Sequence, residues 1–500
     1  MTLRLHHLTF THANSSTPLF EDLSLHVSAG WTGLIGPNGS GKTSLLELAA
    51  GVLKADSGSV EREGFPVFCA QRTDAPPDDQ RSFAEAVDAE ASRLRRLLHI
   101  ESDWHERWES LSHGERKRLQ IAVALWKNPD ILLIDEPTNH LDRDSLDFLH
   151  QALHGFTGTG ILVTHDRHLL DSLCQVCIFL EPGGIRRYPG SYTQAREQKQ
   201  RDEVSVKRER VRLKHELGRL DKEAKSRQHE ARRADSRKSK RHLDRHDSDG
   251  RGRIGLAIVT GKDGVAGKLA SQMQARIQRC QTDLATLQVT PEYQLQFRLP
   301  GSISSRNHLL HLEAGQIALG PERTLSFPRL IMGTRDRIAL VGPNGSGKSL
   351  LLSHLIPHLN VDHERLVYLP QEISLDRSRA VMQELRAQPR QQLGTIFSII
   401  SCLGSRPERL LESEQASPGE IRKVLLALGI AREPHLIIMD EPTNHLDLNA
   451  IELLEQALQG CPSAMLLISH DRRFLQNLTV SSWRIVSTGT DQQLVFDNEV

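Results

Sequence analysis

GPNGSGKT, residues 36–43, is the stretch that decides the fold, and it occurs again almost unchanged as GPNGSGKS at 342–349. In each copy an apolar segment precedes it (WTGLI, RIALV) and a helix-forming segment follows it (SLLELAAG, LLLSHLI). Strand, glycine loop and helix form the context in which GxxxxGK[ST] binds nucleotide phosphates. The glycines let successive backbone N–H groups turn toward the phosphates, and the helix N-terminus adds a favourable dipole.

The two loops supply equivalent chemical groups. Each lysine places a mobile positive charge beside the phosphates, and the residue after it offers a hydroxyl to Mg²⁺. We therefore predict two phosphate sites, built from Gly36, Asn38, Gly39, Gly41, Lys42 and Thr43, and from Gly342, Asn344, Gly345, Gly347, Lys348 and Ser349.

A second motif, DEPTNHLD, occurs at 135–142 and again, unchanged, at 440–447. The lysine of the glycine loop precedes the glutamate of this motif by 94 positions in the first copy and by 93 in the second. A histidine follows the glutamate by 29 positions in both copies. Because internal repeats indicate duplicated structure, we predict two copies of one domain, residues 1–192 and 291–500, called the first and second repeat below.

Two apolar runs, ILLIDE and LIIMDE, lead into this second motif and read as buried parallel strands that end in carboxylates. Ligands bind at the carboxyl ends of the strands in such sheets. Asp135 and Asp440 are therefore placed to hold Mg²⁺, while Glu136 and Glu441 are placed to polarise an attacking water.

Residues 193–290 between the repeats have a different composition. Residues 196–280 hold 25 Lys and Arg against 13 Asp and Glu, although the whole chain has 63 of each sign. The formal net charge of zero thus conceals two acidic repeats and a basic linker.

Apolar residues in this linker follow coiled-coil spacing in two segments, which predicts an antiparallel helical hairpin. Six glycines from Gly250 to Gly267 are expected to interrupt helicity and form an irregular tip. The first arm, residues 196–243, would be about 70 Å long at 1.5 Å per residue. The apolar positions are Val206, Leu213, Leu217, Leu220, Ala224, Ala231 and Ala234 in the first arm, and Met273, Ile277, Cys280, Leu284 and Leu287 in the second.

The overall composition, with 38% hydrophobic and 25% charged residues in 500, is that of a soluble globular chain. Every apolar stretch is shorter than the ~20 residues of a membrane span, so no membrane insertion is expected. The N-terminus lacks the pattern of a secretion signal, and six irregularly spaced cysteines suggest reduced thiols. We expect a cytoplasmic protein. The CxxC of Cys174 and Cys177 lies in an apolar stretch and is interpreted as packing.

LSHGE at 111–115 and ASPGE at 416–420 each place a serine three residues before a glutamate, ahead of a helical segment. This spacing predicts a capping box, and taken alone it indicates nothing more than a well-capped helix. Pro418 agrees with that prediction, because the first helical position needs no N–H donor.

Taken together and in this order, the glycine loop, Gln71 or Gln371, Ser-x-Gly-Glu, DEPTNHLD and a trailing THD or SHD resemble the nucleotide-binding domain of ATP-binding cassette (ABC) proteins. In that family two domains pair head to tail around two ATP molecules. The resemblance implies two composite ATP sites with Mg²⁺ and catalytic glutamates and histidines. One comprises Lys42, Gln71, Asp135, Glu136 and His165 with Ser417 and Gly419, the other Lys348, Gln371, Asp440, Glu441 and His470 with Ser112 and Gly114.

The sequence departs from that family pattern at two kinds of position. One glycine of the usual signature pair is His113 in the first repeat and Pro418 in the second. Proline has no N–H to donate, so weaker ATP binding is expected at the first site. An aromatic residue that stacks on adenine is usual near the start of each domain; the nearest match is His12, with none in the second repeat.

Two fused cassettes with EPTNHLD, a long charged linker and no membrane span are similar to the ABC-F subfamily. The resemblance implies a monomeric ATPase that binds the ribosome, with the linker hairpin reaching rRNA and tRNA near the peptidyl-transferase region. Gln71 precedes Ser112 by 41 positions and Gln371 precedes Ser417 by 46, which leaves no space for the additional arm of several housekeeping members. This spacing favours the antibiotic-resistance, ribosome-protection members.

Four alternatives stay open at this point. Three of them are other functions for the chain: a housekeeping or stress translation factor, the ATPase component of a transporter with a separate membrane subunit, or a DNA-handling ATPase. The fourth concerns the charged residues of the linker. A charge run such as residues 233–253 is often merely a solvated surface. GKDGVAGK at 261–268 faintly resembles a glycine loop, but its glycine spacing differs and no acidic strand follows, so we reject it as a third ATP site.

Overall fold

The computed structural model forms two compact units, Met1–Ala195 with Tyr293–Val500, and Arg196–Glu292. Both repeats belong to the first unit, and the linker forms the second. The structure describes residues 2–13, 15–139, 141–181, 184–237, 262–286, 299–320, 323–403, 405, 410, 417–444, 446–489 and 491–497.

The strands of the first repeat are β1 (Leu3–Phe10), β2 (Phe20–Val27), β3 (Gly30–Ile35), β4 (Ser57–Arg62), β5 (Pro66–Cys69), β6 (Ile131–Asp135), β7 (Thr159–Val163), β8 (Cys174–Glu181) and β9 (Gly184–Pro189). Among the described residues they form a six-stranded sheet of order β5-β6-β7-β3-β8-β9 and a three-stranded sheet of order β2-β1-β4. The larger sheet is parallel except for β9, and the smaller one is antiparallel.

Both faces of the large sheet are covered, which explains why its central strands are apolar throughout. In β6, Leu132 and Ile134 face one core, whereas Ile131 and Leu133 face the other. An uninterrupted apolar run is therefore required there. The helices are α1 (Lys42–Ala50), α2 (Gln80–Glu85), α3 (Ala89–Leu97), α4 (His113–Trp126), α5 (Arg143–His154) and α6 (Arg167–Leu173), with a 3₁₀ turn η1 (Trp108–Ser110).

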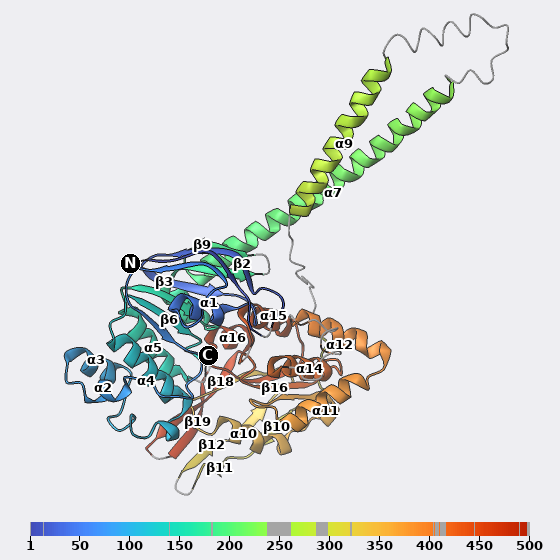
Figure 1. Cartoon of the computed structure of the whole chain (residues 1–500). Coiled ribbons are helices and arrows are strands. Elements are labelled where there is room, and N and C mark those ends of the chain that lie inside the picture. Colours follow the sequence, from blue (N-terminus) through green and yellow to red (C-terminus); the bar gives the residue numbers. More distant parts are fainter. Residues whose placement is uncertain are drawn as a thin grey trace, which may run out of the picture. The chain divides into compact units, whose positions relative to one another are not determined.

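The second repeat has the same plan, but its main sheet is larger and continuous over eight strands (Figure 1). Its strands are β10 (Leu310–Leu312), β11 (Gly315–Ala318), β12 (Thr324–Phe327), β13 (Leu330–Met332), β14 (Arg337–Val341), β15 (Leu366–Leu369), β16 (Leu436–Asp440), β17 (Ala464–Ile468), β18 (Ser481–Thr488) and β19 (Asp491–Asp497). In the described residues, the main sheet has the order β11-β12-β19-β18-β14-β17-β16-β15, and β10 pairs with β13. The parallel strands β15, β16, β17 and β14 match β5, β6, β7 and β3 of the first repeat.

The helices of the second repeat also follow the first. They are α10 (Lys348–Leu355), α11 (Leu375–Arg386), α12 (Arg390–Cys402), α14 (Pro418–Ile430), α15 (Leu448–Gln459) and α16 (Arg472–Leu478), with 3₁₀ turns η3 (Ile356–His358) and η4 (His363–Arg365). In each repeat a helix begins at the lysine of the glycine loop and another begins directly after the Ser of the Ser-x-Gly-Glu motif.

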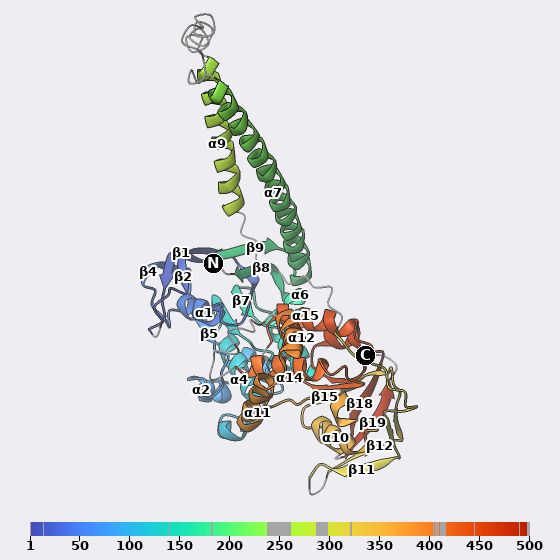
Figure 2. The ribbon, with the colours of Figure 1, turned by 90° about the vertical axis from the view of Figure 1, so that its right-hand side faces the viewer.

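The linker contains two long helices, α7 (Tyr192–Arg237) and α9 (Lys262–Thr286), which run side by side (Figure 2). Leu213, Leu220, Met273 and Cys280 are buried, and the Cys280 thiol donates a hydrogen bond to the Leu213 carbonyl oxygen at 3.4 Å. All four belong to the predicted seam, so the helical hairpin is confirmed where the structure describes it. Ala231, Ala234 and Leu287 lie outside the described side chains.

The predicted irregular tip, Gly250 to Gly267, extends too far toward the C-terminus. Gly264 and Gly267 lie inside α9, which begins at Lys262. A glycine costs a helix only about 1 kcal/mol relative to alanine, and the residues after Gly267 are good helix formers. The rejected glycine-loop match at 261–268 overlaps this helix, and residues 238–261 lie outside the described part of the chain.

The seam can be tested with one buried and one exposed position of α7. Leu220 is 3% exposed and Val211 is 55% exposed. Leu220→Ala should weaken the hairpin by about 2 kcal/mol and so reduce amide hydrogen-exchange protection in α9 roughly 30-fold. Val211→Ala should leave that protection unchanged. Equal protection in both variants would contradict the packing described here.

Candidate functional site

Each glycine loop has a backbone that only glycine adopts readily at two positions. Gly39 and Gly41 have φ of 78° and 92° in the first repeat, and their counterparts Gly345 and Gly347 have 72° and 93°. A Cβ added at Gly41 would lie 2.7 Å from Cζ of Phe20, and one at Gly347 would collide with Leu319. Each loop therefore requires both of its glycines for left-handed turns, and it requires the second one, Gly41 or Gly347, for close packing below it as well.

The lysine that ends each loop folds back over it. Lys42 Nζ donates to the carbonyl oxygens of Gly36 and Pro37 at 2.8 and 3.1 Å, and Lys348 makes the same two bonds in the second repeat at 2.7 and 2.9 Å. Burial lowers the pKa of both lysines, and nearby carboxylates partly offset that effect. Each ammonium group is thus held against its glycine loop, beside the N-terminus of the helix that follows the loop. Both the ammonium charge and the helix dipole favour a phosphate there.

The hydroxyl and carboxylate predicted to hold Mg²⁺ are in direct contact in both repeats. Thr43 Oγ1 donates to Asp135 Oδ2 at 2.6 Å, and Ser349 Oγ donates to Asp440 Oδ2 at 2.7 Å. Burial raises the pKa of both aspartates, and the bond from the hydroxyl opposes this shift. Because Mg²⁺ prefers oxygen ligands of this kind, the residues present fit that ion.

The adjacent glutamates occupy a strained backbone at the ends of β6 and β16. Glu136 has φ of 45° and Glu441 has φ of 50°, a region that non-glycine residues rarely adopt. The sheet holds them there, because their N–H groups donate to Val163 and Ile468 of the neighbouring strands at 2.8 and 2.9 Å. Strain of this kind persists where the surrounding structure fixes it, commonly at functional sites.

A histidine approaches each glutamate, but the two glutamates differ in pKa. His165 Nε2 lies 3.0 Å from Glu136 Oε1, and His470 Nε2 lies 3.3 Å from Glu441 Oε1. Burial pushes the pKa of Glu136 upward, but His165 and Lys42 outweigh it and hold that pKa below its ordinary value. At the second site burial prevails and raises the pKa of Glu441 to about 7, and it lowers the pKa of His470 to about 4.

The Ser-x-Gly-Glu motifs form complete capping boxes, as predicted. Ser112 accepts from the Glu115 N–H while the Glu115 carboxylate accepts from the Ser112 N–H, and Ser417 with Glu420 does the same. In the described part of the chain, the hydroxyls of Ser112 and Ser417 bond within these boxes and reach no residue of the opposite repeat.

A buried cation five residues after each of these serines joins the capped helix to the segment of the predicted glutamine. Lys117 donates to the carbonyl oxygens of Ala70 and Gln71 at 2.7 and 3.2 Å. Arg422, at the equivalent position, donates to Gln371 O and to Glu441 O. The side chains of both glutamines are exposed. Sequence reasoning missed these cations, although their burial at 3% and 5% exposure marks them as paired groups.

The two repeats meet through reciprocal contacts between a glycine loop and the last aspartate of DEPTNHLD. The Asn38 N–H donates to Asp447 Oδ2 at 3.2 Å, and the Asn344 N–H donates to Asp142 Oδ2 at 3.3 Å. The other carboxylate oxygen of each aspartate caps the helix that follows, α15 or α5. Each loop therefore faces the opposite repeat, which is a head-to-tail arrangement.

Comparisons with known proteins agree with this geometry. A family model described as ABC transporter matches residues 20–139 and 329–444. The chain is similar to the ribosome protection protein VmlR of Bacillus subtilis (28% identical, covering 95% of this chain and 85% of VmlR) and to the erythromycin resistance ATP-binding protein MsrA of Staphylococcus epidermidis (28%, 90% and 91%). It is also similar to the ATP-binding protein Uup of Escherichia coli (26%, 94% and 78%).

The family model matches once in each repeat, and these relatives are similar along both repeats and the linker. The chain belongs to the ABC-F proteins. A crystal structure of archaeal ribosome recycling factor aABCE1 with ribosomal stalk protein aP1 shares the fold, with a TM-score of 0.64 at 16% identity over 98% of this chain and 90% of that one. Where this ABC-F chain is described, its helices are too short or too polar to cross a membrane.

The structure shows the surroundings of His12, the residue suggested to stack on adenine, but not a contact with the base. His12 is exposed, its ring meets Phe10 edge-on at 4.9 Å, and its Nε2 lies 3.1 Å from Ser44 Oγ in α1. The imidazole thus lies beside the helix that starts at the first glycine loop, where a base would follow the phosphates. Its contact with adenine stays a prediction.

The unequal glutamates predict opposite effects on stability when each is replaced by glutamine. Glu441 has a folded pKa above the ordinary ~4.3 of glutamate, so its charge costs stability as pH rises from about 4.3 through 7. Glu441→Gln should therefore stabilise nucleotide-free protein at pH 8, by up to about 3 kcal/mol, and much less at pH 5.

Glu136 has the opposite sign, because its folded pKa is lowered and its charge stabilises the fold above the ordinary glutamate pKa. Glu136→Gln should therefore lower the melting temperature at pH 8, and the loss should shrink as the pH falls toward 4. Differential scanning fluorimetry of both variants across this range measures the difference. A similar decrease in both at pH 8 would show that the two carboxylates are electrostatically equivalent.

Proposed function

We propose that this ABC-F protein is an ATPase that binds the ribosome and alters translation. ATP would hold the two repeats together, and its hydrolysis would release them. The observation that carries the proposal is the reciprocal contact of Asn38 with Asp447 and of Asn344 with Asp142, because it brings each glycine loop against the opposite repeat. A ligand bound in either loop would touch both repeats and so favour their closed arrangement.

Under this proposal the two ATP sites are composite. The first would use the Lys42 loop, Gln71, Asp135, Glu136 and His165 with Ser417 and Gly419; the second would use the Lys348 loop, Gln371, Asp440, Glu441 and His470 with Ser112 and Gly114. The exposed helix N-termini at Ser112 and Ser417 favour such a role, since the dipole of a helix attracts a phosphate to its N-terminus. Pro418 removes one of these donors, so the first site should bind ATP less tightly.

The catalytic step proposed is attack of water on the γ-phosphate. Glu136 and Glu441 would orient and polarise that water, and in the described residues Glu441 Oε1 accepts no hydrogen bond from protein. His165 and His470 would hold the glutamate and the γ-phosphate in register. Mg²⁺, held by Thr43 with Asp135 and by Ser349 with Asp440, would neutralise phosphate charge when bound.

The ribosome is proposed as partner because of the linker and the relatives. The linker has a surplus of basic residues, and Lys and Arg on a long exposed arm neutralise nucleic-acid phosphates with release of counterions. VmlR is named a ribosome protection protein and MsrA an erythromycin resistance protein. We favour antibiotic resistance by ribosome protection, acting in the cytoplasm as a monomer. A housekeeping translation factor is the second candidate, since Uup, whose name mentions neither resistance nor ribosome protection, is about equally similar.

Blocking hydrolysis should trap the protein on its partner. Glu136→Gln combined with Glu441→Gln should still bind ATP and close, but should not turn over. With ATP this protein should therefore co-sediment with 70S ribosomes and inhibit translation, whereas without ATP it should not. The matched control is the same protein with Lys42→Ala and Lys348→Ala, which should lose the ATP-dependent fraction. Free exchange from ribosomes in the presence of ATP would sink the proposal.

The basic run of residues 233–253 should contribute to ribosome binding mainly through its interactions with phosphates. Replacing Lys238, Lys240 and Arg241 with glutamine should lower ribosome affinity and reduce the slope of log affinity against log salt by roughly 0.7–0.9 for each phosphate that is no longer neutralised. Basal ATPase should not change, because these residues lie in the linker. Replacing three exposed arginines of the repeats, Arg81, Arg377 and Arg379, with glutamine is the control of equal charge. Identical salt slopes in both variants would show that the run is only a solvated surface.

Which class of ABC-F protein this is can be decided by growth. Expression in a drug-sensitive bacterium should raise the inhibitory concentration of antibiotics that bind near the peptidyl-transferase region, and the double glutamine variant should not. No change for any such drug, with ribosome binding intact, would favour the housekeeping candidate.

A further inference from the structure

The first turn of α7, where the linker helix leaves the first repeat, is fixed in that repeat's core. Tyr192 is 3% exposed and Ala195 is fully buried among the apolar residues of the first repeat. The Thr193 N–H and hydroxyl donate to the two carboxylate oxygens of Asp171, in α6, at 2.7 and 2.6 Å. The helix therefore starts from a rigid base.

The second repeat holds the same turn from the other side. The Tyr192 hydroxyl donates to Glu452 Oε1 at 2.6 Å. Arg473 Nη1 donates to Thr193 Oγ1 at 3.0 Å and forms an ion pair with Asp171 Oδ2 at 3.1 Å. Two side chains of the second repeat thus converge on two successive residues at the start of the linker helix.

These two side chains belong to the helices that begin at the second repeat's site residues. Glu452 is on α15, whose N-cap is Asp447, the residue that accepts from Asn38 of the first glycine loop. Arg473 is on α16, whose N-cap Asp471 directly follows His470. A short helix moves as a rigid element, so any displacement of its first turn carries Glu452 or Arg473 with it.

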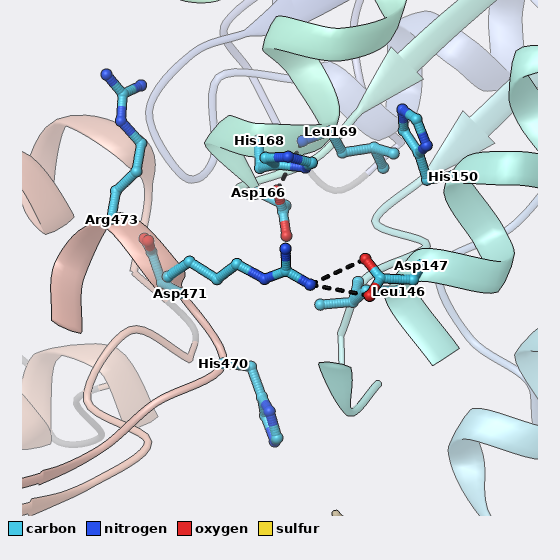
Figure 3. Close-up of a pocket in the computed structure, with 10 residues that line it drawn as sticks. Leu146, Asp147, His150, Asp166, His168, Leu169, His470, Asp471 and Arg473 are labelled. Atoms are coloured by element: carbon cyan, nitrogen blue, oxygen red, sulfur yellow. Dashed lines mark hydrogen bonds and ion pairs between the residues drawn. The ribbon is translucent and has the colours of Figure 1, made fainter. Parts of the chain in front are cut away.

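The residue next to Arg473 shows that this contact is specific. Arg472 Nη2 donates to both carboxylate oxygens of Asp147 at 2.9 Å, at the edge of a pocket between the repeats (Figure 3). Arg473 also lines this pocket, but Figure 3 shows its side chain directed away from Asp147. Neighbouring arginines therefore both cross to the first repeat, but only Arg473 reaches the base of α7.

We propose that Tyr192 and Thr193, held by Glu452 and Arg473, are positioning residues through which the second repeat controls the linker arm. This inference rests on the proposed function, in which binding and hydrolysis of ATP move the two repeats relative to each other. When α15 and α16 shift relative to the first repeat, the first turn of α7 either moves with them or loses these hydrogen bonds. Because such coupling is reciprocal, a partner bound to the arm would also change ATP affinity.

The test measures the arm directly and needs no ribosome. Fluorophores are attached to cysteines introduced at Val211 in α7 and Val87 in the first repeat, which are 55% and 97% exposed. Cys402 is replaced by serine, and the remaining native cysteines are buried. The background is Glu136→Gln with Glu441→Gln, so that ATP with Mg²⁺ binds without turnover. The readout is the change in energy transfer on adding ATP.

Tyr192→Phe with Arg473→Met should reduce the ATP-induced change to less than about half of that in the parent. With ribosomes, the ratio of affinities with and without ATP should fall about 5-fold or more. Both substitutions should leave the melting temperature and, with native glutamates, the basal ATPase rate unchanged. Arg472→Met, which also removes an ion pair between the repeats, should retain the full ATP-induced change. Glu452→Met, which removes the acceptor of the Tyr192 hydroxyl, provides an independent second variant, expected to behave as Tyr192→Phe does.

Three outcomes would overturn the proposal: no ATP-induced change in the parent, an undiminished change in the Tyr192→Phe, Arg473→Met protein, or equal losses with Arg472→Met. The last result would indicate a general weakening of the contact between the repeats. Failure of the ribosomal function looks different. In that case the parent would show the ATP-induced change, and its loss in the variant, without co-sedimenting with ribosomes.

Discussion

The arrangement of the two repeats depends on one aspartate in each repeat, whose carboxylate accepts two hydrogen bonds from different parts of the protein. One oxygen of Asp142 caps the helix that follows it, and the other accepts the backbone N–H of Asn344 in the opposite glycine loop; Asp447 does the same toward Asn38. The cap fixes the direction of the carboxylate, so the position of the opposite loop is fixed as well. The same aspartates contribute to the electrostatic environment of Lys348 and Lys42, which links loop charge to contact between the repeats.

The repeated motifs predicted the fold and the residues within each repeat because their chemistry is local in sequence. Strand, glycine loop, capping box and carboxylate pair each follow from a few neighbouring residues, and the contacts of Thr43 with Asp135 and of Ser349 with Asp440 were found where they were expected. The roles assigned to these residues toward ATP stay predictions. Helix α9 began earlier than predicted, since two glycines did not outweigh the helix-forming residues around them.

Contacts between the repeats were not predicted, because they depend on side chains whose partners lie about 300 positions away. Arg167, Arg472 and Arg473 each cross to the other repeat, yet nothing in THDR or SHDR distinguishes an arginine at an interface from one in solvent. The difference in pKa between Glu136 and Glu441 was also out of reach. Identical motifs surround both, and only the balance of burial and neighbouring charge separates them.

The contacts between the repeats are also unequal, because equivalent arginines of the two repeats differ in burial and in their acidic partners. Arg167 is 5% exposed and binds Glu455 and Asp471 at 2.9 and 3.0 Å, whereas its counterpart Arg472 is one-third exposed and, among the described residues, forms an ion pair with Asp147 alone. His150 occupies the position equivalent to Glu455, eight residues after the capping aspartate, so Arg472 has no carboxylate partner at that position. Burial also lowers the pKa of His150. Removing one partner of a buried pair costs about 3–5 kcal/mol, whereas removing one partner of an exposed pair costs about 0–1 kcal/mol. Substituting Arg167 should therefore weaken the contact between the repeats more than substituting Arg472 does. Arg473, which holds the base of the linker helix, directly follows the more exposed of these two arginines.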